Sequence, residues 1–314
     1  MKKFTKITLI IAGVMVIVGF AMALVGTAMA GGADTILQAA KNGDLNIGNW
    51  HFENGVYYKS EDISDIADIV EDALDIMPGG DESVVNEFSE EITRLEMDVD
   101  LANITIKAGE GEHLTVSFED GYLSYYDVQV NGNMLTVSYD VGTRSFKQGP
   151  KIVVEIPKQM PLEFICVSTD LGEVKIMNLE QNLLGMELDS DLGNIEVDNC
   201  KIDGKCTVFT ALGNIDIDNS SFHNVELSAD MGNVEFAGTV NGDMFAQVDM
   251  GNVEVTIDGE EENYNIELSA DMGDVRYQGQ KQSGMGGSIT YYHENAIGDI
   301  ILNCDMGNVE LGFK

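Results

Sequence analysis

Carboxylate side chains recur at two fixed positions beside a repeated glycine, and these stacked acids are the best candidate for chemistry in the sequence. An aspartate stands two residues before the glycine in six of seven repeats, and an acid stands three residues after it in five. Carboxylate oxygens are the ligands that Ca²⁺ prefers. The two rows therefore predict a calcium site with these candidate ligands: Asp170, Asp191, Asp230, Asp249, Asp271, Asp305, Glu196, Glu235 and Glu254.

A purely structural role for the same acids is the alternative. If the repeats stack about 4.8 Å apart, neighbouring carboxylates repel by about 0.9 kcal/mol per pair even in water. Bound calcium would relieve this repulsion, but salt also screens it on an exposed surface. The repeat matches neither an EF-hand loop nor the repeat of calcium-binding β-rolls. The sequence leaves both alternatives open and indicates no other cofactor.

The acids belong to an octad that occurs seven times at steps of about twenty residues, as in ADMGNVEF and VDMGNVEV. A fixed period of this size is typical of a solenoid, in which each repeat buries its apolar face against its neighbours. Apolar or small residues stand seven, five, three and one positions before the glycine, and two and four positions after it. All these positions are predicted to face inwards, as one side of a strand does.

The inward phase shifts by one residue at the glycine, which requires a bend in the strand. Glycine tolerates positive φ, so each repeat is predicted to turn a corner there. The asparagine that follows most of these glycines is expected to stack on its equivalents in neighbouring coils. The corner glycines are Gly172, Gly193, Gly213, Gly232, Gly251, Gly273 and Gly307.

The predicted fold is all-β: a parallel β-solenoid, or single-stranded β-helix, preceded by a transmembrane helix and a small helical membrane-proximal segment. Each aligned position keeps the same kind of side chain through seven repeats. This favours parallel coils, because each residue then packs on its own equivalent in the coils above and below. A two-residue Gly-Asn loop also suits a type II′ hairpin. An antiparallel β-meander or sandwich is therefore the alternative.

The stretch PKQMPLEFICVSTDLGEVKI, followed by repeated D-[LM]-G-[ND]-[VI]-x-[VI] behind an N-terminal membrane segment, carries a family resemblance. It resembles the bacterial membrane-anchored β-strand-repeat proteins labelled "putative adhesin", which are distantly related to the head GIN domain. The resemblance covers residues 92–314. It implies a β-helix-like, non-enzymatic protein of the cell surface or envelope.

The first 33 residues are predicted to form a cytoplasmic tip and a membrane anchor. Lys2, Lys3 and Lys6 precede an uncharged run that extends from Ile7 to Ala33. About 20 apolar residues span a bilayer, whereas the apolar core of a signal peptide has roughly 7–15. Residues 7–30 are therefore expected to contact lipid, with the amino terminus in the cytoplasm and the rest extracytoplasmic. Secretion after cleavage near Ala30 is the alternative.

Residues 34–90 are predicted to be a separate acidic, membrane-proximal region. Its clearest element is SEDISDIADIVEDALDIMPGG, with apolar residues at helical spacing and acids on the other face. Such a face binds a basic partner or is simply solvated. The β-repeat domain is expected to fill residues 91–314.

Charge limits the partners and the function. The 17 basic and 54 acidic residues give a formal net charge of −37, which excludes nucleic acid as a partner. An envelope protein, a cationic peptide or a polysaccharide remains as a candidate. The four histidines are scattered and the carboxylates are periodic, which does not indicate an enzyme.

We expect a non-enzymatic binding or structural module. The alternative is an envelope-stress or signalling accessory that senses cations or cationic peptides through its acidic face.

Two further features complete the sequence predictions. Cys206 and Cys304 stand at aligned positions of the repeat that are otherwise apolar or small, and they are expected to be buried. The six-residue separation of Cys200 and Cys206 allows a disulfide but does not decide whether it forms. The last step of the repeat contains QGQKQSGMGGSITYYHENAIG, which is predicted to leave the solenoid as a loop at 278–297. Loops on rigid scaffolds often bind ligands.

Overall fold

The structure is a computed structural model that describes residues 76–77, 80–142, 145–146 and 148–314. The chain divides into two units, Met1–Ile66 and Ala67–Lys314, and the described residues all belong to the second. The predicted membrane segment at 7–30, the cleavage site near Ala30 and most of the predicted acidic helix lie outside the described residues. Within the described ranges, no helix has the length and hydrophobicity needed to cross a bilayer.

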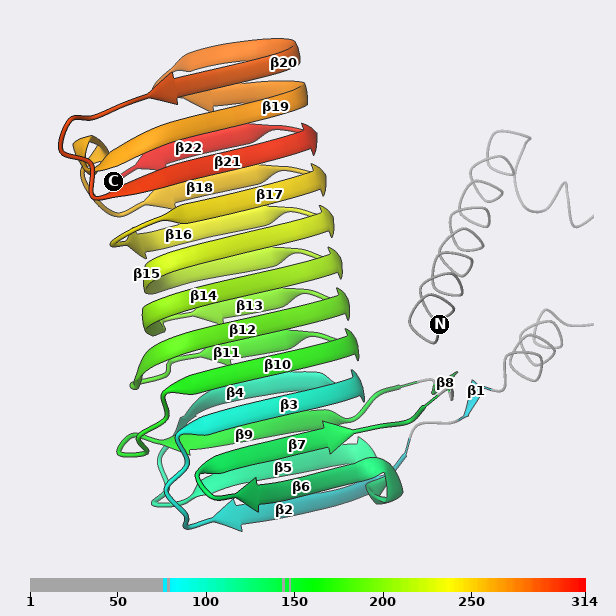
Figure 1. Ribbon diagram of the computed structural model, residues 1–314. Helices are drawn as coiled ribbons and strands as arrows, with labels where there is room; N and C mark the ends of the chain where they lie inside the picture. The colour runs from blue at the N-terminus through cyan, green and yellow to red at the C-terminus, as the bar shows by residue number, and fades with distance from the viewer. Residues whose placement is uncertain (1–75, 78–79, 143–144, 147) are drawn as a thin grey trace, which may run out of the picture. The chain divides into compact units, whose positions relative to one another are not determined.

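The β-repeats form a stack of parallel coils (Figure 1). In one coil, β10 (Phe164–Leu171) leads through a glycine corner into β11 (Val174–Met177). Each strand pairs in parallel and in register with its equivalent in the next coil, so that Ile165 lies opposite Met186 and Val174 opposite Ile195. The fold is thus all-β and solenoid-like, and the antiparallel meander is wrong for the body of the stack.

Two layers of strands make up the stack. The layer before the corners runs in space as β7 (Met134–Tyr139), β3 (Arg94–Leu101), β10, β12 (Asn182–Leu192), β14 (Lys201–Leu212), the end of β15 (Ile215–Met231), β17 (Met244–Met250), β21 (Gly298–Met306) and the start of β19 (Tyr264–Tyr277). The layer after the corners runs as β9 (Lys151–Pro157), β4 (Asn103–Gly109), β11, β13 (Ile195–Asp198), the start of β15, β16 (Val234–Val240), β18 (Val253–Ile257), β22 (Val309–Phe313) and the end of β19.

Antiparallel strands close the N-terminal end of the stack. β6 (Tyr126–Asn131) pairs with β7, β5 (Leu114–Gly121) pairs with β9, and β2 (Glu82–Phe88) pairs with β5. The sheet therefore begins at residue 82, earlier than the predicted domain boundary at 91. β2 was not predicted because it stands outside the repeat and, among the described strands, pairs only with β5.

Two short pieces lie apart from the main sheet. β1 (Ile76–Met77) pairs in parallel with β8 (Ser145–Phe146). Residues 76–77 were predicted to end the acidic helix, so for these two residues the helix prediction is wrong. The 3₁₀ turns η1 (Leu123–Tyr125) and η2 (Glu261–Asn263) connect strands.

The C-terminal end of the stack is not built in chain order. β21 and β22, the last strands of the chain, lie between the coil of β17 and β18 and the coil of β19. The segment predicted as a loop at 278–297 contains β20 (Gln280–Tyr291), which pairs antiparallel with β19 along its length and covers this end (Figure 1). The loop prediction is therefore wrong for residues 280–291. β20 thus takes the place of β19 as the outermost strand at this end.

The core lies between the two layers. Ile165 and Val167 before the corner, and Val174 and Ile176 after it, are at most 1% exposed. The equivalent positions of the other coils are also buried, because alternate residues of a strand point to the same side. This agrees with the predicted inward columns on both sides of the glycine, except at the position directly before it.

Candidate binding surface along the glycine corners

The corner glycines stack on one another, and the stack leaves no room for a side chain. A Cβ added to Gly232 would lie 1.7 Å from the carbonyl oxygen of Gly213 in the neighbouring coil, and one added to Gly193 would lie 1.8 Å from that of Gly172. Six of the seven glycines have positive φ: Gly172, Gly193, Gly232, Gly251, Gly273 and Gly307. Glycine is required both by this backbone conformation and by the close approach of the next coil.

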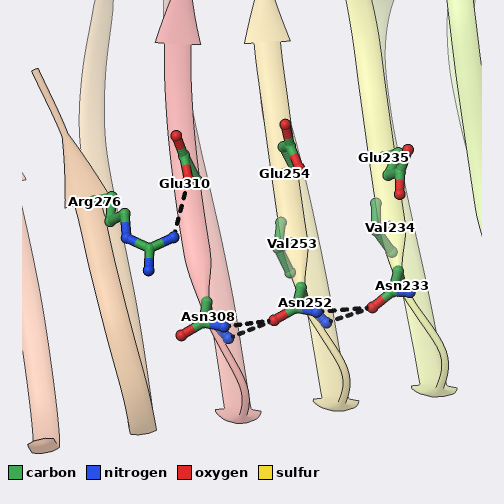
Figure 2. Close-up of a pocket in the computed structure, with 9 residues that line it drawn as sticks. All are labelled: Asn233, Val234, Glu235, Asn252, Val253, Glu254, Arg276, Asn308 and Glu310. Atoms are coloured by element: carbon green, nitrogen blue, oxygen red, sulfur yellow. Dashed lines mark hydrogen bonds and ion pairs between the residues drawn. The ribbon is translucent and has the colours of Figure 1, made fainter. Parts of the chain in front are cut away.

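The asparagines after the glycines form a hydrogen-bonded ladder between coils. The amide N–H of Asn252 donates to Oδ1 of Asn233 at 3.0 Å, and that of Asn308 donates to Oδ1 of Asn252 at 3.1 Å. The side-chain amides add bonds along the same row, 3.1 Å from Asn252 to Asn233 and 2.8 Å from Asn308 to Asn252, as Figure 2 shows. The ladder continues through Asn214 and Asn194. It holds the corners in register and agrees with the predicted stacking.

The residue before each glycine is exposed, or half-buried at Leu192 and Leu212, so its predicted inward position is wrong. Leu or Met occupies this position in every repeat and was predicted to point inwards. In the structure its exposed fraction is 44% at Leu171, 42% at Met250 and 51% at Met272. The prediction was wrong because the chain already turns at the adjacent glycine, so this side chain lies at the rim of the two layers. The result is an exposed apolar row.

This row, the corner stripe, runs along eight coils, with Leu101, Leu192 and Leu212 half-buried and its other five members exposed. Its members pair in register from coil to coil, in the spatial order Leu101, Leu171, Leu192, Leu212, Met231, Met250, Met306 and Met272. Contiguous exposed apolar surface of this kind is typical of interaction sites. The glycine itself could have revealed this row. Side chains alternate between the inward and outward face only along a strand, and that alternation does not apply to the residue where the turn begins.

The aspartate row stands directly beside the corner stripe. Asp249 and Asp305 are exposed, as are Met250 and Met306, which follow them in the chain. Partial burial raises the pKa of the Asp230 carboxyl, and the charge of Asp249 in the next coil raises it further. The aspartates are thus close enough to repel one another, as the sequence predicted for stacked acids.

The second acidic row follows the asparagine ladder. Burial, followed by the charges of Asp218 and Glu196, raises the pKa of Asp216 in this row. At one end Nζ of Lys175 lies 2.9 Å from Glu196, and at the other Nη1 of Arg276 lies 3.3 Å from Glu310 (Figure 2). The basic residues at the ends thus neutralise part of the row.

A shallow hollow of ≈ 260 Å³ lies between the ladder and this second row. Figure 2 shows Glu235, Glu254 and Glu310 along one side of it and the asparagines along the other, with Arg276 at its end. The carboxylates stand one per coil and point away from the strands rather than converging on one point. Among the described residues, no three His, Cys, Asp or Glu side chains are grouped as the ligands of one metal ion would be. The calcium site stays a prediction.

The cysteines lie in or near the core as free thiols. Cys206 and Cys304 are at most 2% exposed, as expected from their columns, and Cys200 is 4% exposed. The disulfide between Cys200 and Cys206 that the spacing left open is not formed. Burial raises the pKa of Cys200 to about 11, and its thiol donates to the carbonyl oxygen of Asp198 at 3.3 Å. Burial thus keeps the thiols of Cys200, Cys206 and Cys304 in the protonated form at neutral pH.

The aromatic residues at the end of β20 do not form a binding loop together. Tyr291 packs on the buried Tyr277, with ring centroids 5.3 Å apart, whereas Tyr292 is exposed. The amide of His293 donates to Oδ1 of Asn265 at 3.0 Å, which fixes the connection to β19. Tyr291 and Tyr292, neighbours in the segment predicted as a loop, therefore lie in different environments.

Solved structures similar to this chain come from bacteria. A putative adhesin from Bacteroides fragilis is 13% identical and covers 75% of this chain and 99% of its own, with a TM-score of 0.43. A putative cell adhesion protein from Clostridium sporogenes is 13% identical and covers 74% of this chain and 99% of its own, with a TM-score of 0.33. A putative lipid binding protein from Parabacteroides distasonis is 12% identical and covers 76% of this chain and 96% of its own, with a TM-score of 0.30. No curated protein matches the chain.

A family model described as Toastrack DUF4097 matches residues 92–300, which is more than half of the chain. The matched range includes the coils from β3 to β19, with their corner glycines, asparagine ladder and acidic rows. It also agrees with the resemblance to β-strand-repeat proteins that the octads carry, which is confirmed. The chain therefore belongs to the Toastrack DUF4097 family.

Proposed function

We propose that this protein is a non-enzymatic binding or structural module, adhesin-like, held in the cell membrane by residues 7–30 with its β-stack outside the cell. The observation that carries the proposal is the corner stripe, a row of exposed and half-buried Leu and Met side chains on a scaffold whose backbone hydrogen bonds repeat from coil to coil. Rigid presentation of apolar side chains lowers the entropy lost on binding. An envelope protein or polysaccharide is the expected partner.

The arrangement of the carboxylates supports a non-enzymatic role. Hydrolases that use carboxylates place two of them on either side of the bond that is cut, in a cleft that excludes water. Here Glu235, Glu254 and Glu310 stand one per coil along an open surface (Figure 2). The strongest pKa shifts among the described residues belong to buried Tyr and Cys side chains such as Tyr277 and Cys206, which are part of the core.

Fractionation of cells that express the full chain tests the anchor and its orientation. We expect the protein in the membrane fraction after a carbonate wash, with the β-stack cut by protease added outside intact cells. Recovery in the medium as a chain that begins after Ala30 would instead show secretion. Protection from external protease in intact cells would contradict the proposed orientation.

Binding is tested with the full chain in lipid nanodiscs. We expect co-sedimentation with purified cell-wall polysaccharide or retention by an immobilised envelope protein. The variant Leu192→Ser with Met231→Ser should weaken it, while Ser168→Thr on the exposed face away from the stripe should not. New reducing ends after incubation with the polysaccharide would show hydrolysis and would overturn the non-enzymatic assignment.

A second candidate function is a sensor of cations or cationic peptides within envelope-stress signalling. The mutual repulsion of Asp230 and Asp249 favours it, because bound positive charge would relieve that repulsion. Thermal melting of the full chain with chelator, then with calcium or magnesium at fixed ionic strength, tests the cation part. A calcium-selective, saturable rise in Tm would support a calcium site on the two acidic rows. An equal small rise with both ions would indicate screening only.

A further inference from the structure

The corner stripe has two chemically different halves. In space, the four coils nearest the N-terminal end of the stripe carry Leu, and the next four carry Met. The chain order conceals this, because Met306 belongs to the last coil and yet lies between Met250 and Met272. The four methionines are thus on four consecutive coils, in register: Met231, Met250, Met306 and Met272.

Leucine and methionine cover a similar apolar area, so the two halves differ chiefly in the presence of sulfur. The methionine side chains are 37% exposed at Met231, 42% at Met250, 43% at Met306 and 51% at Met272. A thioether in the core serves packing, but an exposed thioether is also available as a soft ligand. Thioethers select soft ions such as Cu(I) over the hard ions that carboxylates prefer.

The spacing of the coils fits a metal ion between two sulfur atoms. Parallel strands lie about 4.8 Å apart, and in-register residues of the same type project in parallel. Zinc–thiolate bonds are about 2.3 Å long, and two metal–sulfur bonds of similar length span about 4.6 Å. A monovalent ion between the thioethers of neighbouring coils therefore needs little movement of the backbone.

The backbone at these positions is held while the side chains stay accessible. The carbonyl oxygen of Met250 accepts a hydrogen bond from the amide of Gly232 at 3.0 Å, and that of Met306 accepts one from Gly251 at 3.0 Å. Beside each methionine stands an aspartate, Asp230, Asp249, Asp305 or Asp271, whose charge raises the local concentration of cations.

We propose that Met231, Met250, Met306 and Met272 form a thioether ladder that binds the soft monovalent ion Cu(I) between adjacent coils, with the aspartate row attracting it. The proposal goes beyond the binding function above and does not depend on it. The nearby thiol of Cys304 is not a ligand, since it is 2% exposed and contacts the carbonyl oxygen of Gly251 inside the stack at 3.3 Å.

Silver(I), a redox-stable probe with the same preference for sulfur, tests the ladder. The full chain in nanodiscs is labelled with ¹³C in the methionine methyl groups and titrated with silver nitrate in chloride-free buffer. Cys166 is changed to Ser in every sample, because this half-buried thiol would compete. We expect shifts in four methyl signals, assigned by single Met→Leu variants, and the same shifts when Cu(I) is added anaerobically as its acetonitrile complex.

Matched variants separate the thioethers from the apolar surface. Met250→Leu with Met306→Leu keeps the stripe apolar and introduces the residue found at this position in four other coils, and it should weaken silver binding at least tenfold. The control, Met97→Leu with Met186→Leu, changes two methionines that are at most 3% exposed and should bind as the parent does. Leu212→Met extends the ladder by one coil and should tighten binding or add a site.

Three results would overturn the proposal. Equal silver affinity of the parent and the Met250→Leu, Met306→Leu variant would show that the ladder is not a metal site. So would the absence of any shift in the four methyl signals. Equal shifts on addition of calcium would show that the signals report charge screening at the aspartates rather than coordination by sulfur.

Discussion

The amide of Gly251 donates to the carbonyl oxygen of Met306 at 3.0 Å, so the last coil of the chain lies directly against the coil of Gly251. A Cβ on Gly307 would lie 1.5 Å from the carbonyl oxygen of Gly251, which shows how closely the two coils approach. The coil of Gly273 follows Gly251 in the chain but stacks on Gly307 instead. The coil of Gly307 is therefore inserted between the coils of Gly251 and Gly273, out of chain order.

Deletion of residues 298–314 tests this insertion. Without β21 and β22, β19 loses its parallel partners and β20 stays paired with β19 alone, so we expect amides of residues 264–291 to lose protection in hydrogen exchange. Amides of β10 and β12, several coils away, should keep theirs, because each coil contacts only its neighbours. Unchanged protection of 264–291 would mean that β19 pairs directly with β17, and would contradict a required inserted coil.

Gly232→Ala tests the close approach at the corners. The new methyl carbon would lie 1.7 Å from the carbonyl oxygen of Gly213 and would also sit at positive φ. We expect a loss of roughly 3 kcal/mol or more in the free energy of unfolding, measured by urea denaturation. Gly132→Ala is the control, since Gly132 has φ +66 with open space around it, and should cost about 1 kcal/mol. Equal losses in both variants would mean that backbone strain alone explains the glycine.

Asn252→Ala tests the ladder. Its side chain takes part in three hydrogen bonds between coils, whereas Oδ1 of Asn194 accepts one, from the amide of Asn214. Because a net hydrogen bond contributes about 0.5–1.5 kcal/mol and these are exposed, we expect a loss of about 1–2 kcal/mol for Asn252→Ala and a smaller loss for Asn194→Ala. A larger loss at Asn194 would contradict this order.

Asp230→Asn and Asp274→Asn should have opposite effects at neutral pH. Burial and Asp249 raise the pKa of Asp230, so its charged form disfavours folding, and this penalty disappears as the pH falls through the raised pKa. Asp230→Asn should therefore stabilise the protein at pH 7, by less than about 1 kcal/mol because the site is exposed, and should have no effect below its unfolded pKa of about 3.9.

The pKa of Asp274 is lowered instead, first by its hydrogen bond with Lys281, whose Nζ lies 2.8 Å away. Its charge favours folding above the unfolded pKa, and that contribution is lost as the pH falls through the folded pKa. Asp274→Asn should lower Tm at pH 7 and leave it unchanged at low pH. Melting curves from pH 3 to 7 check both variants, and a shift of the same sign in the two would contradict the assigned causes.

The repeat alone determined the body of the fold. In a parallel stack each residue packs on its own equivalent, so burial of Ile165 or Val174 appears as a column in the sequence. The corner glycines and the asparagine ladder follow from the same logic, because a close approach or a shared hydrogen bond must be repeated in every coil. The acidic rows were visible for this reason as well.

Only the tertiary structure decided which coils are neighbours at the two ends. The sequence orders the coils along the chain, but pairing between distant strands is settled by long-range contacts that local periodicity does not encode. Thus β3 lies between β7 and β10, β21 lies between β17 and β19, and β20 covers the end that it was expected to leave as a loop. The tertiary structure also decided that the residue before each glycine does not point into the core. The inward and outward alternation of side chains along the strand stops one residue before the corner glycine. The uninterrupted run of methionines along the corner stripe results from both effects.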